Sequence, residues 1–264
     1  MSSPENSPFL TAKNLGASFP NDRGQLIALE DISFSVDAQE FVCVLGPSGS
    51  GKSTLLRILG GLMMPTNGQV ILGGQPVQGP HPKVGLVFQD PNLLPWRSVL
   101  QNVLLPLELR PPSKSEASSK GEAVFQAQVV LNLVGLSGFE DYLPRDLSGG
   151  MAQRVAIARA LVHDPDVLLL DEPFGALDAL TRERMGDELS RIWQTRRKTV
   201  VMVTHAIDEA ILLADRILVL GSQPGRLVLD APVDLPRPRA EALRYTPEFG
   251  DLAQTLRAAI GYRK

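Results

Sequence analysis

The sequence predicts an α/β fold with a mixed, mainly parallel sheet, an N-terminal antiparallel β-region and an inserted α-helical region. Three observations support this prediction. Short apolar runs alternate with helical stretches along much of the chain, which is typical of a parallel sheet covered by helices. Two strand-like runs joined by a turn-rich segment come first. A stretch rich in Leu, Ala and Val at helical spacing then interrupts the alternation at residues 90–165.

The first half of the chain supplies the elements in a clear order. Residues 1–8 are expected to form a disordered tail. The runs "FLTAKNLGASF" and "LIALEDISFSV", broken by the turn "PNDRGQ", predict an antiparallel sheet. The continuously apolar "EFVCVLG" is expected of a strand buried on both faces. A helix, "GKSTLLRILGGL", and another strand, "GQVILGG", follow.

A strand–helix rhythm resumes after residue 165. The strands "DVLLLDEP", "TVVMVTH" and "RILVLG" alternate with the helices "LTRERMGDELSRIWQTRR" and "AIDEAILLAD". We therefore expect one domain over 9–264. Its core is residues 9–89 and 166–225 with the β-subdomain, its helical subdomain is 90–165, and its C-terminal extension is 226–264.

Composition excludes several functional classes. The chain has 264 residues, of which 44% are hydrophobic and 21% charged, as in ordinary soluble globular proteins. A net charge of −3 argues against nucleic-acid binding, because such domains usually carry a strong basic patch. A single cysteine rules out an internal disulfide framework. We find neither a secretory signal nor an apolar run near the ~18 residues of a membrane span, and expect a cytoplasmic protein.

The stretch "GPSGSGKST", residues 46–54, predicts a phosphate-binding loop (P-loop), the alternative being a glycine-rich turn with an unrelated lysine. It satisfies the pattern G-x-x-x-x-G-K-[ST] between a buried strand and a helix. Its glycines let the backbone wrap around an anion, and the helix N-terminus supplies partial positive charge. Lys52 is expected to reach the β- and γ-phosphates, and the Ser53 hydroxyl to ligate Mg²⁺. The predicted nucleotide-binding residues of this loop are Gly46, Pro47, Ser48, Gly49, Ser50, Gly51, Lys52, Ser53 and Thr54.

Three other predicted strands end on polar side chains. Asp171 is placed to hold Mg²⁺, and Glu172 to orient or deprotonate an attacking water. His205 is expected near the γ-phosphate, and Gln89 could contact Mg²⁺ or a water. The alternatives are a helix-starting carboxylate pair and a structural histidine. We predict Glu172, His205, Lys52 and Gln89 as catalytic, and Ser53, Gln89 and Asp171 as metal ligands.

A second glycine turn, "LSGGMAQR", begins another predicted helix at residues 147–154. Ser148 can cap the helix N-terminus, while Gly149 and Gly150 leave its first amides exposed. The result is an anion-binding helix end that lacks a lysine. On the residues alone, a capped helix with a tight turn is an equal alternative.

The P-loop, Gln89, "LSGGM", "DE", "GALD" and His205 occur in an order that resembles an ATP-binding cassette (ABC) ATPase over nearly the whole chain. The resemblance implies that ATP and Mg²⁺ are bound and that two cassettes, identical or homologous, form a head-to-tail dimer. Ser148, Gly149 and Gly150 would then contact the γ-phosphate held by the partner. Phe19 stands where the family usually has a tyrosine that stacks on adenine. A strand-end core phenylalanine is the alternative.

Two positions depart from the usual motifs of that family. Gly175 replaces the serine that commonly begins the "GALD" loop, and Met151 replaces the commoner glutamine of the signature. Asp178 still matches the acidic residue of the loop that touches the opposite site. Both departures resemble a subfamily pattern, and neither removes a catalytic group.

The compact length and three segments resemble the nitrate, sulfonate and taurine importers. These segments are "PNLLPWRSVLQNV", "PFGALDALTR" and "LPRPR". The resemblance implies a separate permease, a periplasmic or lipid-anchored solute-binding protein, and a position on the cytoplasmic face of the inner membrane. The resemblance also implies that the segment after Gln89 forms part of a groove for the permease, which Leu93, Leu94, Pro95 and Trp96 suit because an exposed apolar patch usually marks a contact.

Other interpretations remain open at this point. Trp96 could instead pack inside the helical subdomain. A non-transport cassette could regulate a soluble macromolecule, and an importer could carry a different solute. A GTPase or small-molecule kinase is disfavoured, since the chain lacks an N/T-K-x-D guanine motif and this function leaves residues 147–154 unexplained.

Overall fold

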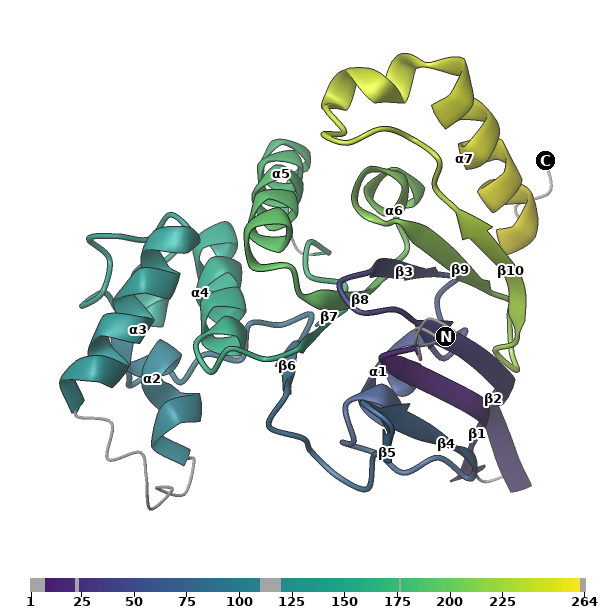
Figure 1. The fold of residues 1–264 in the computed structure, drawn as a ribbon, viewed down its shortest axis with the longest axis horizontal. Coiled ribbons are helices and arrows are strands. Elements are labelled where there is room, and N and C mark those ends of the chain that lie inside the picture. The colour runs from purple at the N-terminus through teal and green to yellow at the C-terminus, as the bar shows by residue number, and fades with distance from the viewer. Residues whose placement is uncertain (1–7, 22–23, 110–119, 176, 262–264) are drawn as a thin grey trace, which may run out of the picture.

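The structure is a computed structural model that describes residues 8–21, 24–109, 120–175 and 177–261. All but the last residue of the tail predicted at 1–8 lies outside these ranges. The architecture confirms the predicted fold class: a mixed, mainly parallel sheet with helices, an antiparallel sheet and a group of helices to one side (Figure 1). None of the described helices is long and apolar enough to cross a membrane.

Two sheets form the frame of the molecule. The antiparallel sheet has the order β2-β1-β4-β5, with strands β1 (Leu10–Asn21), β2 (Gly24–Val36), β4 (Asn67–Leu72) and β5 (Gln75–Pro76). The second sheet has the order β10-β9-β3-β8-β7-β6. Its parallel strands are β3 (Phe41–Leu45), β6 (Val84–Val87), β7 (Val167–Asp171), β8 (Thr199–Thr204) and β9 (Arg216–Leu220).

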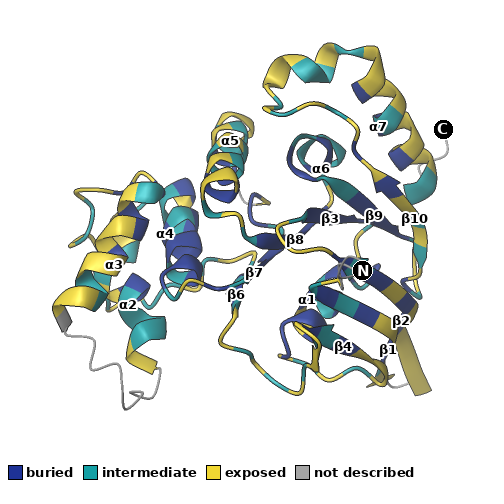
Figure 2. Ribbon diagram, in the orientation of Figure 1, coloured by how far each residue is buried: buried dark blue, intermediate teal, exposed yellow. Residues whose placement is uncertain are grey.

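The two faces of the second sheet bury different sets of residues. Along β3, Val42 and Val44 pack with α1 (Lys52–Leu59) and the antiparallel sheet, whereas Phe41 and Cys43 belong to the other cluster. That cluster includes residues of α5 (Ala179–Arg196), α6 (Ile207–Leu213) and α7 (Pro247–Ile260). Figure 2 shows the central strands buried between these layers, as their continuous apolar runs predict.

The inserted helices lie beside the second sheet, next to its edge strand β6 (Figure 1). They are α2 (Val99–Leu109), α3 (Lys120–Leu133), the short 3-10 helix η1 (Pro144–Asp146) and α4 (Gly149–Leu161). Helix α4 contacts β6 and is almost entirely buried from Val155 onward. The apolar spacing of this segment therefore builds a small core of its own, which continues into the main one.

The strand β10 (Leu227–Pro232) lies inside the range predicted as a C-terminal extension. It pairs antiparallel with β9 and forms the edge of the second sheet. The boundary predicted at residue 226 thus runs through the turn of a β-hairpin. The reason is that β10 alternates exposed residues with half-buried or buried ones, so it lacks the long apolar run of the central strands. A 3-10 helix, η2 (Glu241–Tyr245), and α7 follow.

Candidate active site

The P-loop connects the end of β3 to the start of α1 at the carboxyl edge of the sheet. Gly51 has a φ of +86°, and a Cβ atom there would lie 2.6 Å from Leu29 Cδ2 and 2.8 Å from the Ala28 carbonyl oxygen. Only glycine meets both conditions without moving β2. A Cβ at Gly46 would lie 2.8 Å from the Leu220 carbonyl oxygen, so β9 also limits the loop. The antiparallel sheet and β9 therefore fix the shape of the anion cradle.

The Lys52 side chain lies across this loop and is only 6% exposed. Its Nζ donates hydrogen bonds to the carbonyl oxygens of Gly46 (2.9 Å) and Pro47 (3.0 Å) and lies 3.9 Å from Glu172 Oε1. Burial lowers the pKa of the Lys52 ammonium, against the attraction of Glu172 and Asp171. The structure thus places a buried cation at the centre of the predicted phosphate site.

Ser53 and Asp171 meet across the interface between α1 and β7. The Ser53 hydroxyl donates a 2.9 Å hydrogen bond to Asp171 Oδ1. Burial raises the pKa of the Asp171 carboxyl, and the Ser53 hydrogen bond opposes that shift. A hydroxyl and a carboxylate are the oxygen donors that Mg²⁺ prefers, and a cation here would offset the buried negative charge. The two residues therefore fit a magnesium site.

Glu172 and His205 form a second pair at the same edge. His205 Nδ1 lies 3.0 Å from Glu172 Oε2, and the His205 ring is about half exposed. Glu172 has a φ of +43°, a left-handed conformation that is uncommon for a residue with a side chain. Hydrogen bonds from its amide to the Val203 carbonyl and from the Gly175 amide to its own carbonyl hold this conformation. Such strain is common where a fold aims a side chain at a site.

Gln89, two residues after β6, lies near Gly175 in the loop that follows Glu172. An atom placed as Cβ on Gly175 would lie 3.5 Å from Gln89 Nε2 and 3.6 Å from Glu172 Oε2. The Gly175 Cα is therefore adjacent to both side chains. The structure thus brings the predicted catalytic residues of the P-loop, β6, β7 and β8 to one sheet edge.

The second glycine turn lies at the start of α4. Ser148 caps this helix, since its Oγ accepts a 3.3 Å hydrogen bond from the Met151 amide. Ser148 and Gly149 are exposed, while Gly150 is buried. Within the described ranges, no hydrogen bond or ion pair joins residues 148–150 to residues 46–54. We call residues 148–150 the signature turn. The exposed N-terminus of α4 at this turn is not bonded to the P-loop of the same chain.

Phe19 lies near the end of β1, opposite Leu26 of β2. Both side chains are partly open to solvent, at 37% and 40% exposed. The alternative of a fully buried core phenylalanine is therefore not what the structure shows. A partly exposed aromatic side chain is therefore available at this position.

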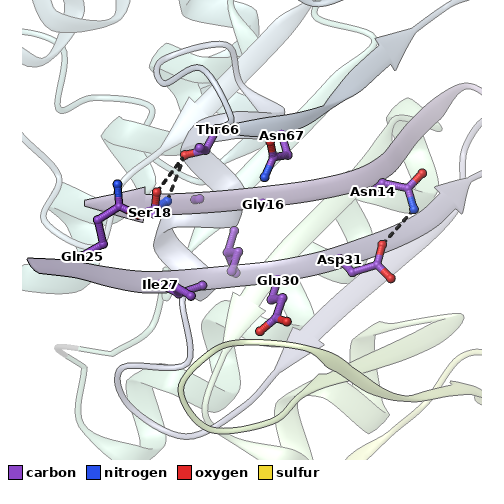
Figure 3. A pocket seen from close by; sticks show the side chains of 11 residues that line it. Asn14, Gly16, Ser18, Gln25, Ile27, Glu30, Asp31, Thr66 and Asn67 are labelled. Atoms are coloured by element: carbon purple, nitrogen blue, oxygen red, sulfur yellow. Dashed lines mark hydrogen bonds between the residues drawn. The ribbon is translucent and has the colours of Figure 1, made fainter. Parts of the chain in front are cut away.

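A cavity of about 440 Å³ lies on the antiparallel sheet, between β1, β2 and the turn at Thr66 (Figure 3). Its rim is polar: Asn14 donates to Asp31 at 2.8 Å, and the Ser18 amide donates to the Thr66 hydroxyl at 3.0 Å. None of the predicted phosphate, metal or catalytic residues lines it. The cavity is therefore distinct from the candidate active site.

Two residues that sequence reasoning missed tie α4 to the loop around Gln89. Gln153 is buried and its Nε2 donates to the Phe88 carbonyl oxygen at 3.4 Å. The Arg159 guanidinium donates to the carbonyl oxygens of Pro91 (2.6 Å) and Asn92 (2.8 Å). Burial lowers the pKa of Arg159. Because these contacts join residues more than 60 positions apart, no local pattern could have identified them.

Asn102 shapes the segment predicted to meet a permease. It is fully buried, its Oδ1 accepts from the Leu94 amide at 2.8 Å, and its Nδ2 donates to the carbonyls of Leu94, Arg97 and Ser98. Trp96, in contrast, is 73% exposed. The alternative in which Trp96 packs inside the helical subdomain is therefore wrong, whereas Leu93 does pack against the core.

Comparisons with known proteins agree with this geometry. The ABC transporter family domain matches residues 29–175. The nitrate import ATP-binding protein NrtD of Synechococcus elongatus is 47% identical over 253 residues, which are 94% of this chain and 89% of the relative. The aliphatic sulfonates import ATP-binding protein SsuB of Bacillus licheniformis is 44% identical over 86% of this chain and 84% of the relative.

Solved structures point to the same family. A dimeric ABC transporter cassette aligns with a TM-score of 0.76 at 35% identity and covers 86% of this chain and 99% of that one. A second structure, of a post-hydrolysis state bound to ADP and Pi, aligns with a TM-score of 0.75 at 34% identity, over 86% of this chain and 99% of that one. Together with the P-loop, the signature turn and the Glu172–His205 pair, these likenesses establish that the chain is an ATP-binding ATPase of the ABC transporter family.

Proposed function

We propose that the chain is the ATP-hydrolysing subunit of an ABC importer that moves a small anionic solute, such as nitrate, a sulfonate or taurine, through a separate permease. The observation that carries the proposal is the convergence of Lys52, Ser53, Asp171, Glu172 and His205 on one sheet edge. The nitrate and sulfonate import proteins that the chain resembles over most of its length support the importer role and the class of solute.

The side chains of the site divide the chemistry among themselves. Glu172 orients and deprotonates the attacking water, and His205, 3.0 Å away, holds the carboxylate in place and stabilises phosphate charge. Lys52 neutralises charge on the β- and γ-phosphates, and Phe19 stacks on the adenine. Ser53, Asp171 and Gln89 hold Mg²⁺, which when bound offsets the charge of the phosphates. The Gly51 cradle keeps the backbone amides aimed at the anion.

The signature turn makes the site depend on a second cassette. Its helix N-terminus and exposed Ser148 supply dipoles that stabilise phosphate charge, as an arginine does in other phosphate-transferring enzymes. They serve the γ-phosphate held by the partner, identical or homologous. Binding of two ATP molecules between the cassettes then closes the dimer. The dimeric state of the similar cassette supports this arrangement.

The permease contact is assigned to the segment at residues 93–96. Trp96 offers an exposed aromatic ring, and Asn102 holds the backbone beneath it through four hydrogen bonds. Gln153 and Arg159 connect the start of this loop to α4, so a displacement at Trp96 reaches the signature turn. A solute-binding protein outside the membrane would complete the importer, with the cassette on the cytoplasmic face.

A pull-down from native membranes tests the proposal. We expect the tagged chain to recover an integral membrane permease and the Trp96→Ala variant to lose it. Tyr245→Ala is the matched control, because Tyr245 is an 83% exposed aromatic residue on η2 and should leave recovery unchanged. Full ATP hydrolysis with no membrane partner recovered would contradict the importer function and favour a regulator of a soluble macromolecule.

A further inference from the structure

Helix α5 lies between α4 and α6 and contacts both (Figure 1). Its first turns are close to two parts of the active site. The loop that precedes it contains Gly175 and Asp178, and α6 follows directly after His205. One ion pair, Arg182–Glu209, joins α5 to α6 in this region.

The Arg182 guanidinium makes two contacts. Its Nη2 donates a 3.0 Å hydrogen bond to the Leu177 carbonyl oxygen, and its Nε lies 3.5 Å from Glu209 Oε1. The Glu209 side chain is only 13% exposed and that of Arg182 35%. Arg182 therefore connects the loop before α5 to α6 through an ion pair whose carboxylate is largely shielded from solvent.

The other oxygen of Glu209 acts on the residue before His205. Its Oε2 accepts a 2.6 Å hydrogen bond from the Thr204 hydroxyl, and Thr204 Oγ1 accepts from the Ala206 amide at 3.0 Å. Thr204 is 2% exposed. These bonds hold the backbone on both sides of His205, whose imidazole then meets Glu172.

The start of α5 also lies against the signature turn. A Cβ atom on Gly149 would be 3.8 Å from Leu177 Cδ2, and one on Gly150 would be 2.9 Å from Thr181 Cγ2. The turn therefore cannot shift toward α5 without moving Leu177 or Thr181. Neighbouring residues therefore lead from the turn through α5 and α6 to the Glu172 carboxylate.

We propose that the Arg182–Glu209 pair is a positioning link that couples the signature turn of a chain to the Glu172–His205 pair of the same chain. The inference rests on the proposed function. In the dimer each signature turn serves the nucleotide of the partner, while Glu172 serves its own, so the link joins the two ATP sites. Burial raises the pKa of the Glu209 carboxyl, and the Thr204 hydrogen bond and then the charge of Arg182 oppose that shift.

Steady-state kinetics of the full chain test the link through two variants, Arg182→Gln and Glu209→Gln. We expect each to lower kcat about five- to tenfold, the range of moderate couplings between sites, and to bring the Hill coefficient for ATP toward 1. Binding of ATP to the monomer should change by less than about twofold, because neither residue lies in the P-loop. The kcat of the double variant should be no lower than that of the more impaired single variant, because both substitutions break the same link.

The matched control is Arg244→Gln. Arg244 pairs with Glu183, the neighbour of Arg182 on α5, at 2.9 Å, but this pair leads to η2 and not to His205. It should leave kcat and the Hill coefficient unchanged. The inference is overturned if Arg182→Gln behaves like this control, or if its loss of kcat follows a loss of ATP binding or of thermal stability. A wild-type chain that hydrolyses ATP but stays monomeric with ATP would overturn the proposed dimer as well.

Discussion

The imidazole of His205 and the carboxylate of Glu172 lie 3.0 Å apart although 33 positions separate them in the chain. They come from neighbouring parallel strands, β8 and β7, whose carboxyl ends meet at one edge. The left-handed backbone of Glu172 aims its side chain at the ring. Catalysis at this edge should therefore depend on the pair as a unit.

Replacing Glu172 with Gln should stop hydrolysis while ATP still binds. The amide keeps the shape of the side chain but cannot accept the proton of water, so we expect kcat to fall by at least about 100-fold. The variant should accumulate as an ATP-bound dimer in size-exclusion chromatography with multi-angle light scattering. A variant that remains monomeric with ATP would speak against this mechanism.

Asp171 should contribute to the pH dependence of the free energy of unfolding. Burial raises its pKa above 3.8, so the folded protein holds this proton more tightly than the unfolded chain does. Stability from this residue is therefore greatest at low pH and is lost as pH rises through the folded pKa. Urea unfolding between pH 4 and 7 should show wild type losing stability relative to Asp171→Asn as pH rises.

Asp178→Asn is the control for that experiment, because the pKa of Asp178 is shifted in the opposite direction to that of Asp171. Asp178 caps α5 and accepts a 3.0 Å hydrogen bond from the Thr181 amide. Interaction with the Thr181 side chain and then this amide bond lower the pKa of its carboxyl. Its contribution is therefore present at neutral pH and is lost as pH falls through the folded pKa. The same sign of pH dependence in both comparisons would refute the assigned causes.

Replacing Ser148 with Arg should separate nucleotide binding from dimer formation. The side chain blocks the exposed end of α4 without touching the P-loop, so monomer affinity for ATP should change by less than about twofold. ATP-driven dimerisation in the Glu172→Gln background should disappear. Ser137→Arg, an exposed change elsewhere in the helical region, is the control and should dimerise normally.

Replacing Gly51 with Ala should damage the P-loop itself. The left-handed φ costs about 1–2 kcal/mol for a residue with a side chain, and the overlap with Leu29 adds to it. Both thermal stability and ATP affinity should fall, which differential scanning fluorimetry and a fluorescent nucleotide can measure. Gly250→Ala is the contrasting change: its Cβ has open space within α7, so stability should rise by about 0.5–1 kcal/mol.

Local patterns were enough to predict most of the fold, and they also predict site residues that the structure places at one sheet edge. The buried strand before residue 46 and the apolar run before Asp171 each identify their own element, and parallel pairing then brings their ends together. Contacts between distant polar residues have no such pattern. Gln153 and Arg159 donate hydrogen bonds to backbone carbonyl oxygens. Every residue of the loop has such an oxygen, so the side chains of the loop do not reveal the partners.

The "LPRPR" stretch shows the same limit. Arg239 donates to the carbonyls of Ile211 and Ala214 at the end of α6, and Arg237 stacks 4.3 Å over the Trp193 ring. The sequence marked this stretch only by its resemblance to a subfamily. Its physical role, which is to fasten the C-terminal segment to α5 and α6, depends on partners that the fold alone brings near.

Asn102 holds the backbone of the segment around Trp96, whereas the exposed side chains of that segment set its surface chemistry. Because its amide bonds to the backbone of residues 94, 97 and 98, the outline of this surface does not depend on which side chains stand there. Exposed positions such as Trp96 are free to diverge without refolding. Substitutions at these positions would therefore change the chemistry of the surface while the backbone beneath it keeps its shape.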